Sequence, residues 1–291
     1  MFVKDNYVRF SEAPWFPGSV PINTFVGGAG GIGSWLAFFL SRIGYTVTIM
    51  DFDIIEAHNL GGQLFTNSDI GKHKVNAVKD IQDSFAVSHN VFPYVDRVTR
   101  DTQVERYVFS AFDNMVARKE LFEAWKKANV ESILSYNLAK QEYFEDRRIL
   151  EEAIVLASSV SEFEEEESGL ERQLKVLFES KEVLDAKYQD YLLQNPIPIF
   201  IDGRLEMEQL QIFCVTPDKM EEYEKTLFDD AIVEDLPCTM KQTSHSAAMI
   251  ASLMTSFFTN HITNVREGMI VREVPFYHEF FIPMGLTNNN Y

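Results

Sequence analysis

Glycines with the spacing of a phosphate-binding loop lie near the start of the chain. Residues 24–34 read TFVGGAGGIGS, in which Gly28, Gly30 and Gly33 form the pattern G-x-G-x-x-G and Gly31 adjoins it. Such glycines are needed where a strand turns tightly into a helix, a phosphate approaches the backbone and the helix packs close to the sheet. Free N–H groups at the start of that helix can then bind the anion. The pattern predicts that this loop contacts nucleotide phosphates.

A carboxylate follows the loop at the offset that a nucleotide-binding unit needs. Residues 22–26 predict a strand and residues 46–50 a second one, with a helix between them that Gly44 ends. Asp51 comes directly after the second strand, where a carboxylate can accept hydrogen bonds from both ribose hydroxyls of a nucleotide. The glycines alone also fit any tight turn in an α/β protein. Strand, helix and acid together predict nucleotide binding.

Length and charge limit the kind of protein this can be. The chain has 291 residues, 46% of them hydrophobic, enough for one large domain or two small ones with a sizeable core. Its 26 basic and 44 acidic residues leave a net charge of −18, which repels a phosphate backbone, so we expect no nucleic-acid partner. We find no secretion signal and no apolar run long enough to span a membrane, which predicts a cytoplasmic protein without a membrane partner.

Strand and helix patterns alternate along the rest of the chain. In parallel sheets the carboxyl ends of the strands form the ligand crevice, and Asp51 and Asp113 both follow predicted strands. Ser68 or Asp69 is expected to cap the helix that carries Val75. The sequence predicts an α/β fold: a Rossmann-like, mostly parallel sheet with helices on both faces and a helical insertion. Further strands are predicted at residues 90–95, 107–112, 132–136, 197–201, 210–215 and 270–281, and helices at 115–127 and 246–258.

Four regions are expected along the chain. Residues 1–21 form an N-terminal lead-in, and residues 22–137 form the nucleotide-binding half of the domain. Residues 138–195 form an acidic helical insertion. Residues 196–291 form the C-terminal half of the same domain, with a cysteine loop and a buried or dimer-facing helix.

The insertion has a distinct composition. Residues 141–180 contain 12 acidic and 4 basic side chains, and apolar residues recur at helical spacing on both sides of a break expected near Gly169. Two interpretations stay open: a solvated two-helix lid with an apolar seam, or a docking surface for a basic partner.

Four motifs in order identify a family resemblance. They are the glycine loop, Asp51-Phe52-Asp53 with Asn59 and Gln63, the segment Gly71-Lys72-His73-Lys74, and Asp113-Asn114 with Arg118. Together they resemble the ubiquitin-activating-enzyme-like adenylating family that includes ThiF, MoeB and HesA. The match covers residues 22–120 well. Beyond it, residues 236–239 (LPCT) are similar to the P-x-C-T loop of members that form a thioester, although here the proline directly precedes the cysteine.

The resemblance implies a role for each matching residue. Asp51 would hold the ribose, Asn59 and Lys74 would contact the phosphates, and Asp113 would bind Mg²⁺, a hard cation that takes carboxylate, water and phosphate oxygens. Each also has a structural alternative: Asn59 shapes a loop, Lys74 is a surface lysine, and Asp113 caps the next helix. The full set expected to contact the nucleotide is Gly28, Gly30, Gly31, Gly33, Asp51, Asp53, Asn59, Gln63, Lys74 and Asn114.

Two departures from the family pattern are evident. Gly62 stands where the family motif N-L-x-R-Q has an arginine, so a donor to the phosphates is missing. Arg9, from a second subunit, or Arg204 could replace it. The two C-x-x-C pairs that bind zinc in many bacterial relatives are also missing, so we expect no zinc.

The two cysteines have different expected roles. Cys214 lies in an apolar run and is expected to be a small core residue. Cys238, with Lys241 and His245 nearby, is a candidate thioester nucleophile, since a loop position beside basic groups favours a reactive thiolate. A structural cysteine at the start of a helix is an equal alternative.

The sequence thus predicts ATP-dependent adenylation of the C-terminal carboxylate of a ubiquitin-like protein or peptide, with ATP and Mg²⁺ as cofactors and thioester formation on Cys238 as a further step. A homodimer and a conjugating or sulfur-transfer partner are expected.

Two alternative functions stay open. An NAD(P)-dependent dehydrogenase fits the glycines and Asp51 but leaves Lys74 and Asp113 unexplained. A non-catalytic nucleotide-binding scaffold would account for the arginine lost at Gly62.

Overall fold

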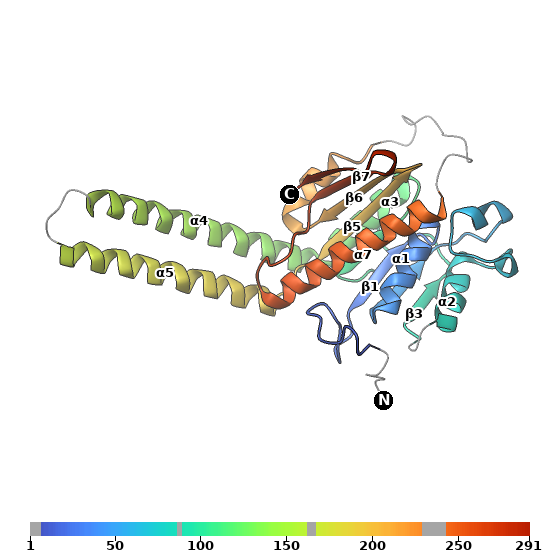
Figure 1. The fold of residues 1–291 in the computed structure, drawn as a ribbon, viewed down its shortest axis with the longest axis horizontal. Helices are drawn as coiled ribbons and strands as arrows, with labels where there is room; N and C mark the ends of the chain where they lie inside the picture. Colours follow the sequence, from blue (N-terminus) through green and yellow to red (C-terminus); the bar gives the residue numbers. More distant parts are fainter. Residues whose placement is uncertain (1–6, 86–88, 162–166, 229–242) are drawn as a thin grey trace.

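A single eight-stranded sheet forms the centre of the protein (Figure 1). The computed structural model describes residues 7–85, 89–161, 167–228 and 243–291. The strand order is β3-β2-β1-β4-β5-β6-β7-β8; the first five of these run parallel, and β6 to β8 are antiparallel to their neighbours. This confirms the predicted Rossmann-like, mostly parallel sheet. The strands are β1 (Asn23–Gly27), β2 (Thr46–Met50), β3 (Val91–Tyr94), β4 (Tyr107–Ser110), β5 (Ile199–Glu206), β6 (Gln209–Val215), β7 (Tyr277–Phe281) and β8 (Leu286–Asn290).

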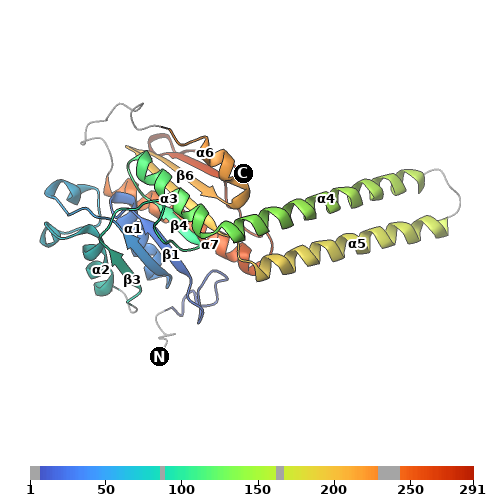
Figure 2. The same cartoon turned by 180° about the vertical axis from the view of Figure 1, so that it is seen from behind.

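Helices cover both faces of the sheet because its central strands are apolar on both sides. Val26 packs into the core under α1 (Gly31–Arg42), α2 (Lys74–Phe85) and α7 (Ser244–Glu267). Its neighbour Phe25 points to the opposite face, which α3 (Met115–Ala128) and α6 (Met220–Glu224) cover (Figure 2). The helix expected to be buried or dimer-facing is α7, and it packs on α1, β5 and β6. Short 3₁₀ turns complete the fold at Ala57–Gly61, Asn67–Asp69, Pro217–Lys219 and Ile282–Met284.

Two long helices lie between α3 and β5 and extend away from the sheet (Figure 1). They are α4 (Val130–Ser161) and α5 (Glu167–Gln194). The strand predicted at residues 132–136 is wrong, because these residues form the first turns of α4. Short apolar runs fit both states, and here Ile133, Tyr136 and Tyr143 are buried along one helical face. The predicted break near Gly169 is confirmed to within a few residues, since α4 ends at Ser161 and α5 begins at Glu167.

The structure confirms one predicted helix end and corrects two other predictions. Gly44, with φ +102°, follows the C-cap of α1, as predicted. Asp69 does not cap α2, which begins at Lys74; its carboxylate instead accepts the backbone N–H of Thr66 at 2.9 Å and closes a 3₁₀ turn. The polar tail forms the edge strand β8, and only the last part of residues 270–281 is a strand.

No helix within the described ranges combines the length and apolar character of a membrane span.

Candidate active site

The glycine loop joins β1 to α1 and approaches its surroundings closely. The backbone N–H of Gly28, which has φ +91°, donates to the carbonyl of Met50 at 2.9 Å. A Cβ at Gly33 would lie 1.9 Å from the carbonyl oxygen of Gly28, so only glycine fits there. A Cβ at Gly30 would meet nothing within 4 Å. The loop therefore needs Gly33 for its own packing, and the open space beside Gly30 leaves room for a phosphate.

Asp51 holds the glycine loop against the end of β2. Its Oδ2 accepts the backbone N–H of Ala29 at 2.7 Å, and its Oδ1 accepts that of Asp53 at 2.7 Å. The residue is only 9% exposed. A carboxylate has about four acceptor sites, so two stay available for ribose hydroxyls.

Lys74 and Asp53 form an ion pair at the same edge of the sheet. The Lys74 Nζ lies 2.8 Å from Asp53 Oδ2, and its backbone N–H donates to the Asp53 carbonyl at 3.0 Å. The lysine side chain is 10% exposed and the aspartate side chain 47%. The start of α2 is thereby fixed to the end of β2. Because an ammonium group has three donors, this lysine can bind Asp53 and a phosphate together.

Asn59 and Gln63 shape the loop between β2 and α2. The Oδ1 of Asn59 accepts the backbone N–H of Glu56 at 2.9 Å, as the loop-shaping alternative predicts. The backbone N–H of Gln63 donates to the Asn59 carbonyl at 3.0 Å. The side-chain Oε1 of Gln63 is buried and has no hydrogen-bond partner among the described residues. A buried acceptor without a donor is costly, and a ligand that supplies an N–H or O–H would satisfy it.

Asp113 follows β4, the third strand whose carboxyl end lies at this edge of the sheet. The backbone N–H of Ala111 donates to the Gly27 carbonyl at 2.9 Å, so the residues after β4 continue beside the glycine loop. Asn114 is the N-cap of α3, and its Oδ1 accepts the backbone N–H of Ala117 at 2.8 Å. It also donates to Asp113 Oδ1 at 3.3 Å. The expectation that Asp113 caps the helix is therefore wrong, and its exposed carboxylate faces solvent.

The residues present fit a nucleotide and Mg²⁺. The glycine backbone and Asp51 supply polar groups for a nucleotide at the carboxyl ends of β1 and β2. Within the described parts of the chain, no three His, Cys, Asp or Glu side chains gather as a metal cluster. A single carboxylate such as that of Asp113 suits Mg²⁺, which usually keeps several waters and binds substrate phosphates.

A buried charge cluster lies beside the Asp113 loop. Asp202 on β5 is fully buried, and Arg118 of α3 and Arg204 both bind its carboxylate, the latter at 2.8 Å. Arg118 also donates to the carbonyls of Phe112 and, at 3.1 Å, Gly203. Burial alone would raise the pKa of Asp202, but the two arginine charges outweigh it and hold the pKa below its usual value. Arg118 thus ties the loop that carries Asp113 to β5.

Arg204 is not directed at the phosphate loop. Beyond Asp202, its guanidinium donates to the hydroxyl of Thr226 at 3.0 Å and to the Thr226 carbonyl at 3.2 Å, and it lies 4.4 Å from the centre of the Phe213 ring. These contacts place it on the α6 side of the sheet. Three of its five N–H donors are thus used within the domain, which disfavours the predicted role of Arg204 as the substitute for the family arginine.

The remaining predicted residues are Arg9 and the two cysteines. Arg9 is exposed in the segment that packs near Tyr45, at the opposite edge of the sheet from the glycine loop, so only a second subunit could bring it to a crevice (Figure 1). Cys238 falls outside the described residues. Cys214 is buried in β6, and burial raises the pKa of its thiol well above the usual value, which makes it a core residue.

Arg97 was not among the predicted site residues. It follows β3 at the crevice edge of the sheet, and its guanidinium carbon lies 4.1 Å from the centre of the Phe52 ring. Phe52 itself follows Asp51. The signal in the sequence was an arginine placed just after a predicted strand, where ligand contacts gather in parallel sheets.

Fold and site together define a Rossmann-like α/β protein whose glycine loop and strand-end carboxylates lie at one edge of the sheet. The sequence model of the ThiF family matches residues 22–274, and the chain belongs to this family. The resemblance inferred from the four motifs is thereby confirmed. Family membership supports ATP-dependent adenylation in general. A sequence search of curated proteins finds no match.

Solved structures show the same fold at low sequence identity. MccB of E. coli with ATP superposes with a TM-score of 0.53 at 11% identity, covering 92% of this chain and 63% of MccB. MccB of E. coli with selenomethionyl MccA has a TM-score of 0.51, 12% identity and the same coverage. Selenomethionyl PaaA has a TM-score of 0.55 at 12% identity, covering 99% of this chain and 72% of PaaA. The chain therefore spans less than two thirds of the MccB chains.

Proposed function

We propose that this protein is an ATP-dependent adenylating enzyme that activates the C-terminal carboxylate of a peptide or ubiquitin-like protein. One observation carries the proposal: the glycine loop, the Asp51 and Lys74 side chains and the Asp113 carboxylate all lie at the carboxyl ends of three neighbouring strands, β2, β1 and β4. Solved MccB structures that hold ATP or MccA share the fold and motivate the choice of a peptide substrate.

In the proposed reaction, a carboxylate oxygen of the substrate attacks the α-phosphorus of ATP. The bond to the bridging oxygen breaks, pyrophosphate leaves with its electron pair, and an acyl-adenylate results. Asp51 holds the ribose, the glycine backbone contacts the phosphates, and Lys74 and Asn59 offset the charge that grows on them. Mg²⁺, held by Asp113, would neutralise phosphate charge when bound. Catalysis then depends on positioning and charge, with little acid–base chemistry.

The missing family arginine needs a substitute. Arg97 lies at the crevice edge of the same chain. Arg9 could act only across a subunit boundary, which would make the enzyme a homodimer with shared sites. Because a guanidinium that stabilises a phosphate acts on the reaction step, Arg97→Ala and Arg9→Ala can be compared by their effect on the exchange rate. The variant that loses more exchange at unchanged ATP affinity identifies the substitute.

Cys238 would act after adenylation. A thiolate there would attack the acyl carbonyl, release AMP and form a thioester, which a conjugating or sulfur-transfer partner in the cytoplasm would accept. Adenylation itself does not need this cysteine.

ATP–pyrophosphate exchange tests the proposal. With candidate peptides and small ubiquitin-like proteins, the wild type should incorporate labelled pyrophosphate into ATP, Asp113→Ala should abolish exchange, and Cys238→Ala should spare it. Exchange that survives Asp113→Ala would remove this residue from its assigned role. Binding of NADH in place of ATP would favour a dehydrogenase, and ATP binding without exchange for any substrate would favour a scaffold.

A further inference from the structure

The hairpin of α4 and α5 is an antiparallel two-stranded coiled coil. The residues of each helix that face the other helix form its seam. They recur at alternating steps of three and four residues, the spacing that keeps one stripe of each helix against its partner. Near the base, the Tyr143 and Tyr188 rings stack with their centres 4.1 Å apart. Anchors to the domain also lie near the base, where Lys140 binds Asp218 at 2.6 Å and Gln189 donates to the Glu267 carbonyl at 2.9 Å. Seam positions are Ile133, Tyr136, Lys140, Tyr143, Arg147, Leu150, Ile154 and Ala157 on α4, and Leu174, Leu177, Lys181, Leu184, Tyr188 and Tyr191 on α5.

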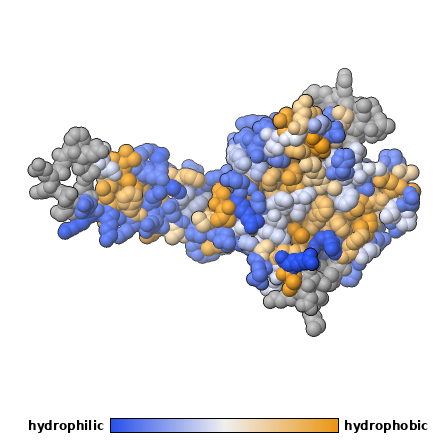
Figure 3. All heavy atoms as spheres, viewed as in Figure 1, coloured by the Kyte–Doolittle hydropathy of each residue, from blue (hydrophilic) through white to orange (hydrophobic). Residues whose placement is uncertain are grey.

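One flank of the hairpin carries apolar side chains that the seam does not bury. Ile149 and Leu156 on α4 are 52% and 67% exposed, and Val176 and Val183 on α5 are 58% and 69% exposed. Each pair is seven residues apart, almost two full turns, so its members share one face of their helix. Figure 3 shows apolar side chains on the outer part of the hairpin, bordered by polar ones. Exposed apolar side chains also occur on the other flank, at Val155 and Phe178, so the hollow between the helices is what distinguishes this flank.

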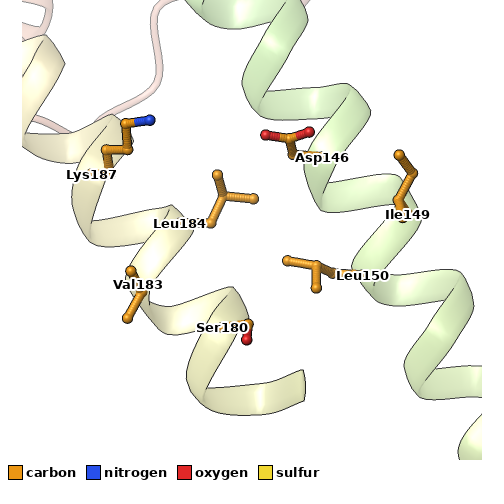
Figure 4. Close-up of a pocket in the computed structure, with 7 residues that line it drawn as sticks. All are labelled: Asp146, Ile149, Leu150, Ser180, Val183, Leu184 and Lys187. Atoms are coloured by element: carbon orange, nitrogen blue, oxygen red, sulfur yellow. The ribbon is translucent and has the colours of Figure 1, made fainter. Parts of the chain in front are cut away.

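This flank is hollowed between the two helices. A cavity of about 370 Å³ opens there, and Figure 4 shows Leu150 and Leu184 pointing toward each other across it, with Asp146 and Lys187 together at one end. Ile149 and Val183 complete its apolar lining. We call this site the hairpin groove and define it by Ile149, Leu150, Val183 and Leu184. The ribbon views show the outer hairpin extending clear of the sheet domain (Figures 1 and 2).

The α4 border of the hairpin groove is acidic, whereas on the α5 side the cavity is lined by Lys187. Glu142, Glu145 and Asp146 precede Ile149 by seven, four and three residues, which places all three on its side of α4. None of them forms an ion pair with another residue of the described chain. A second copy of the hairpin would bring the same carboxylates to the interface and be repelled, whereas a basic partner would be attracted.

We propose that the hairpin groove binds an amphipathic helix of a partner protein, with a leucine-type apolar face and lysine or arginine along its borders. The apolar face of such a helix would cover Ile149 and Val183 and fill the space above Leu150 and Leu184, as in other helix-in-groove complexes. Its basic borders would meet Glu142, Glu145 and Asp146. The adenylation crevice takes no part in this contact, so the interaction goes beyond the proposed reaction.

A designed probe tests the proposal on the full-length protein. The probe is a fluorescein-labelled helical peptide of about 18 residues, long enough to lie along the groove, cross-linked to hold it helical, with leucine on one face and lysine elsewhere. Fluorescence anisotropy should show saturable binding that weakens with salt. A peptide with glutamate in place of lysine should not bind. The double variant Ile149→Asp/Val183→Asp should weaken binding about tenfold or more, although it adds negative charge.

A matched variant keeps the test specific. Val155 and Phe178 are 69% and 52% exposed but point to the other flank of their helices, so Val155→Asp/Phe178→Asp should leave affinity within about twofold. Circular dichroism checks that both variants stay helical. Equal binding of the two peptides, equal loss in the two variants, or no binding to the wild type overturns the proposal. A wild-type dimer in sedimentation that Ile149→Asp/Val183→Asp dissociates would instead identify a second copy as the occupant.

Discussion

Asp202 is a fully buried carboxylate held between two guanidinium groups. Arg118 and Arg204 compensate its charge, and Arg118 also binds the carbonyl of Phe112, next to the candidate magnesium residue Asp113. A buried charge that loses its partner costs far more than an exposed one. The cluster therefore couples the stability of the domain to the position of the loop that carries Asp113.

Replacing Asp202 by asparagine should lower the free energy of unfolding by about 3–5 kcal/mol, because it leaves two buried arginines without their carboxylate. Urea unfolding followed by circular dichroism measures this. Asp101→Asn is the matched control, since the Asp101–Lys127 pair, at 2.7 Å, has side chains that are 75% and 69% exposed; it should change stability by less than about 1 kcal/mol. Equal effects of the two substitutions would contradict this account.

His261 makes stability depend on pH. It is buried in α7, and its Nε2 lies 2.9 Å from the carbonyl oxygen of Ile197, so the neutral ring donates the hydrogen bond. Burial lowers the pKa of His261 to about 4, from a usual value of 6.5. Between these two values the unfolded chain binds a proton that the folded protein does not. Stability is therefore retained above the higher value and lost as the pH falls toward the lower one.

His261→Gln should remove much of this dependence, because glutamine keeps an N–H donor and cannot titrate. The loss of unfolding free energy between pH 7 and pH 5 should be about 2 kcal/mol smaller in the variant than in the wild type. Urea unfolding at the two pH values measures the difference. Identical losses in the two proteins would show that His261 is not the titrating group.

At the scale of elements, the turn from β1 to α1 decides whether a nucleotide can bind. Gly33→Ala would place a methyl group on the Gly28 carbonyl, 1.9 Å away, and backbone cannot yield as a side-chain end can. We expect a stability loss of about 1–3 kcal/mol and a loss of ATP affinity of at least about tenfold. Calorimetric titration with ATP and urea unfolding measure both.

Gly61→Ala serves as the control for this loop. A Cβ at Gly61 meets nothing within 4 Å, so stability and ATP affinity should stay close to wild type. If Gly33→Ala behaved like Gly61→Ala, the loop could not have the close packing described above.

At the scale of the whole molecule, the outer part of the hairpin does not pack against the sheet domain. The cores on both faces of the sheet draw on α1, α2, α3, α6 and α7, while the outer hairpin packs only on itself. Replacing residues 144–187 by a short Gly/Ser linker between Tyr143 and Tyr188, whose rings are 4.1 Å apart, should therefore leave ATP affinity within about twofold. Loss of ATP binding or of cooperative unfolding would show that the hairpin supports the domain.

The sequence by itself predicted most of the residues that gather at the candidate site. The glycine loop, Asp51 and Asp113 were predicted because each lies within a few residues of a strand end, and in parallel sheets those ends meet at one edge. Lys74, at the start of α2, was predicted from the family resemblance. The fold class and family followed from the same local patterns. Arg97 was missed, although it too follows a strand, because nothing local distinguishes it from a surface arginine.

Only the tertiary structure decided which distant residues meet. Arg118 and Asp202 are 84 positions apart, and Asp202 also binds Arg204, the residue expected to replace the family arginine. The helix at residues 132–136 and the cavity between α4 and α5 depend likewise on how long helices pack. The physical reason is that local spacing determines which groups a strand or helix presents, whereas packing between distant segments determines what each group can reach.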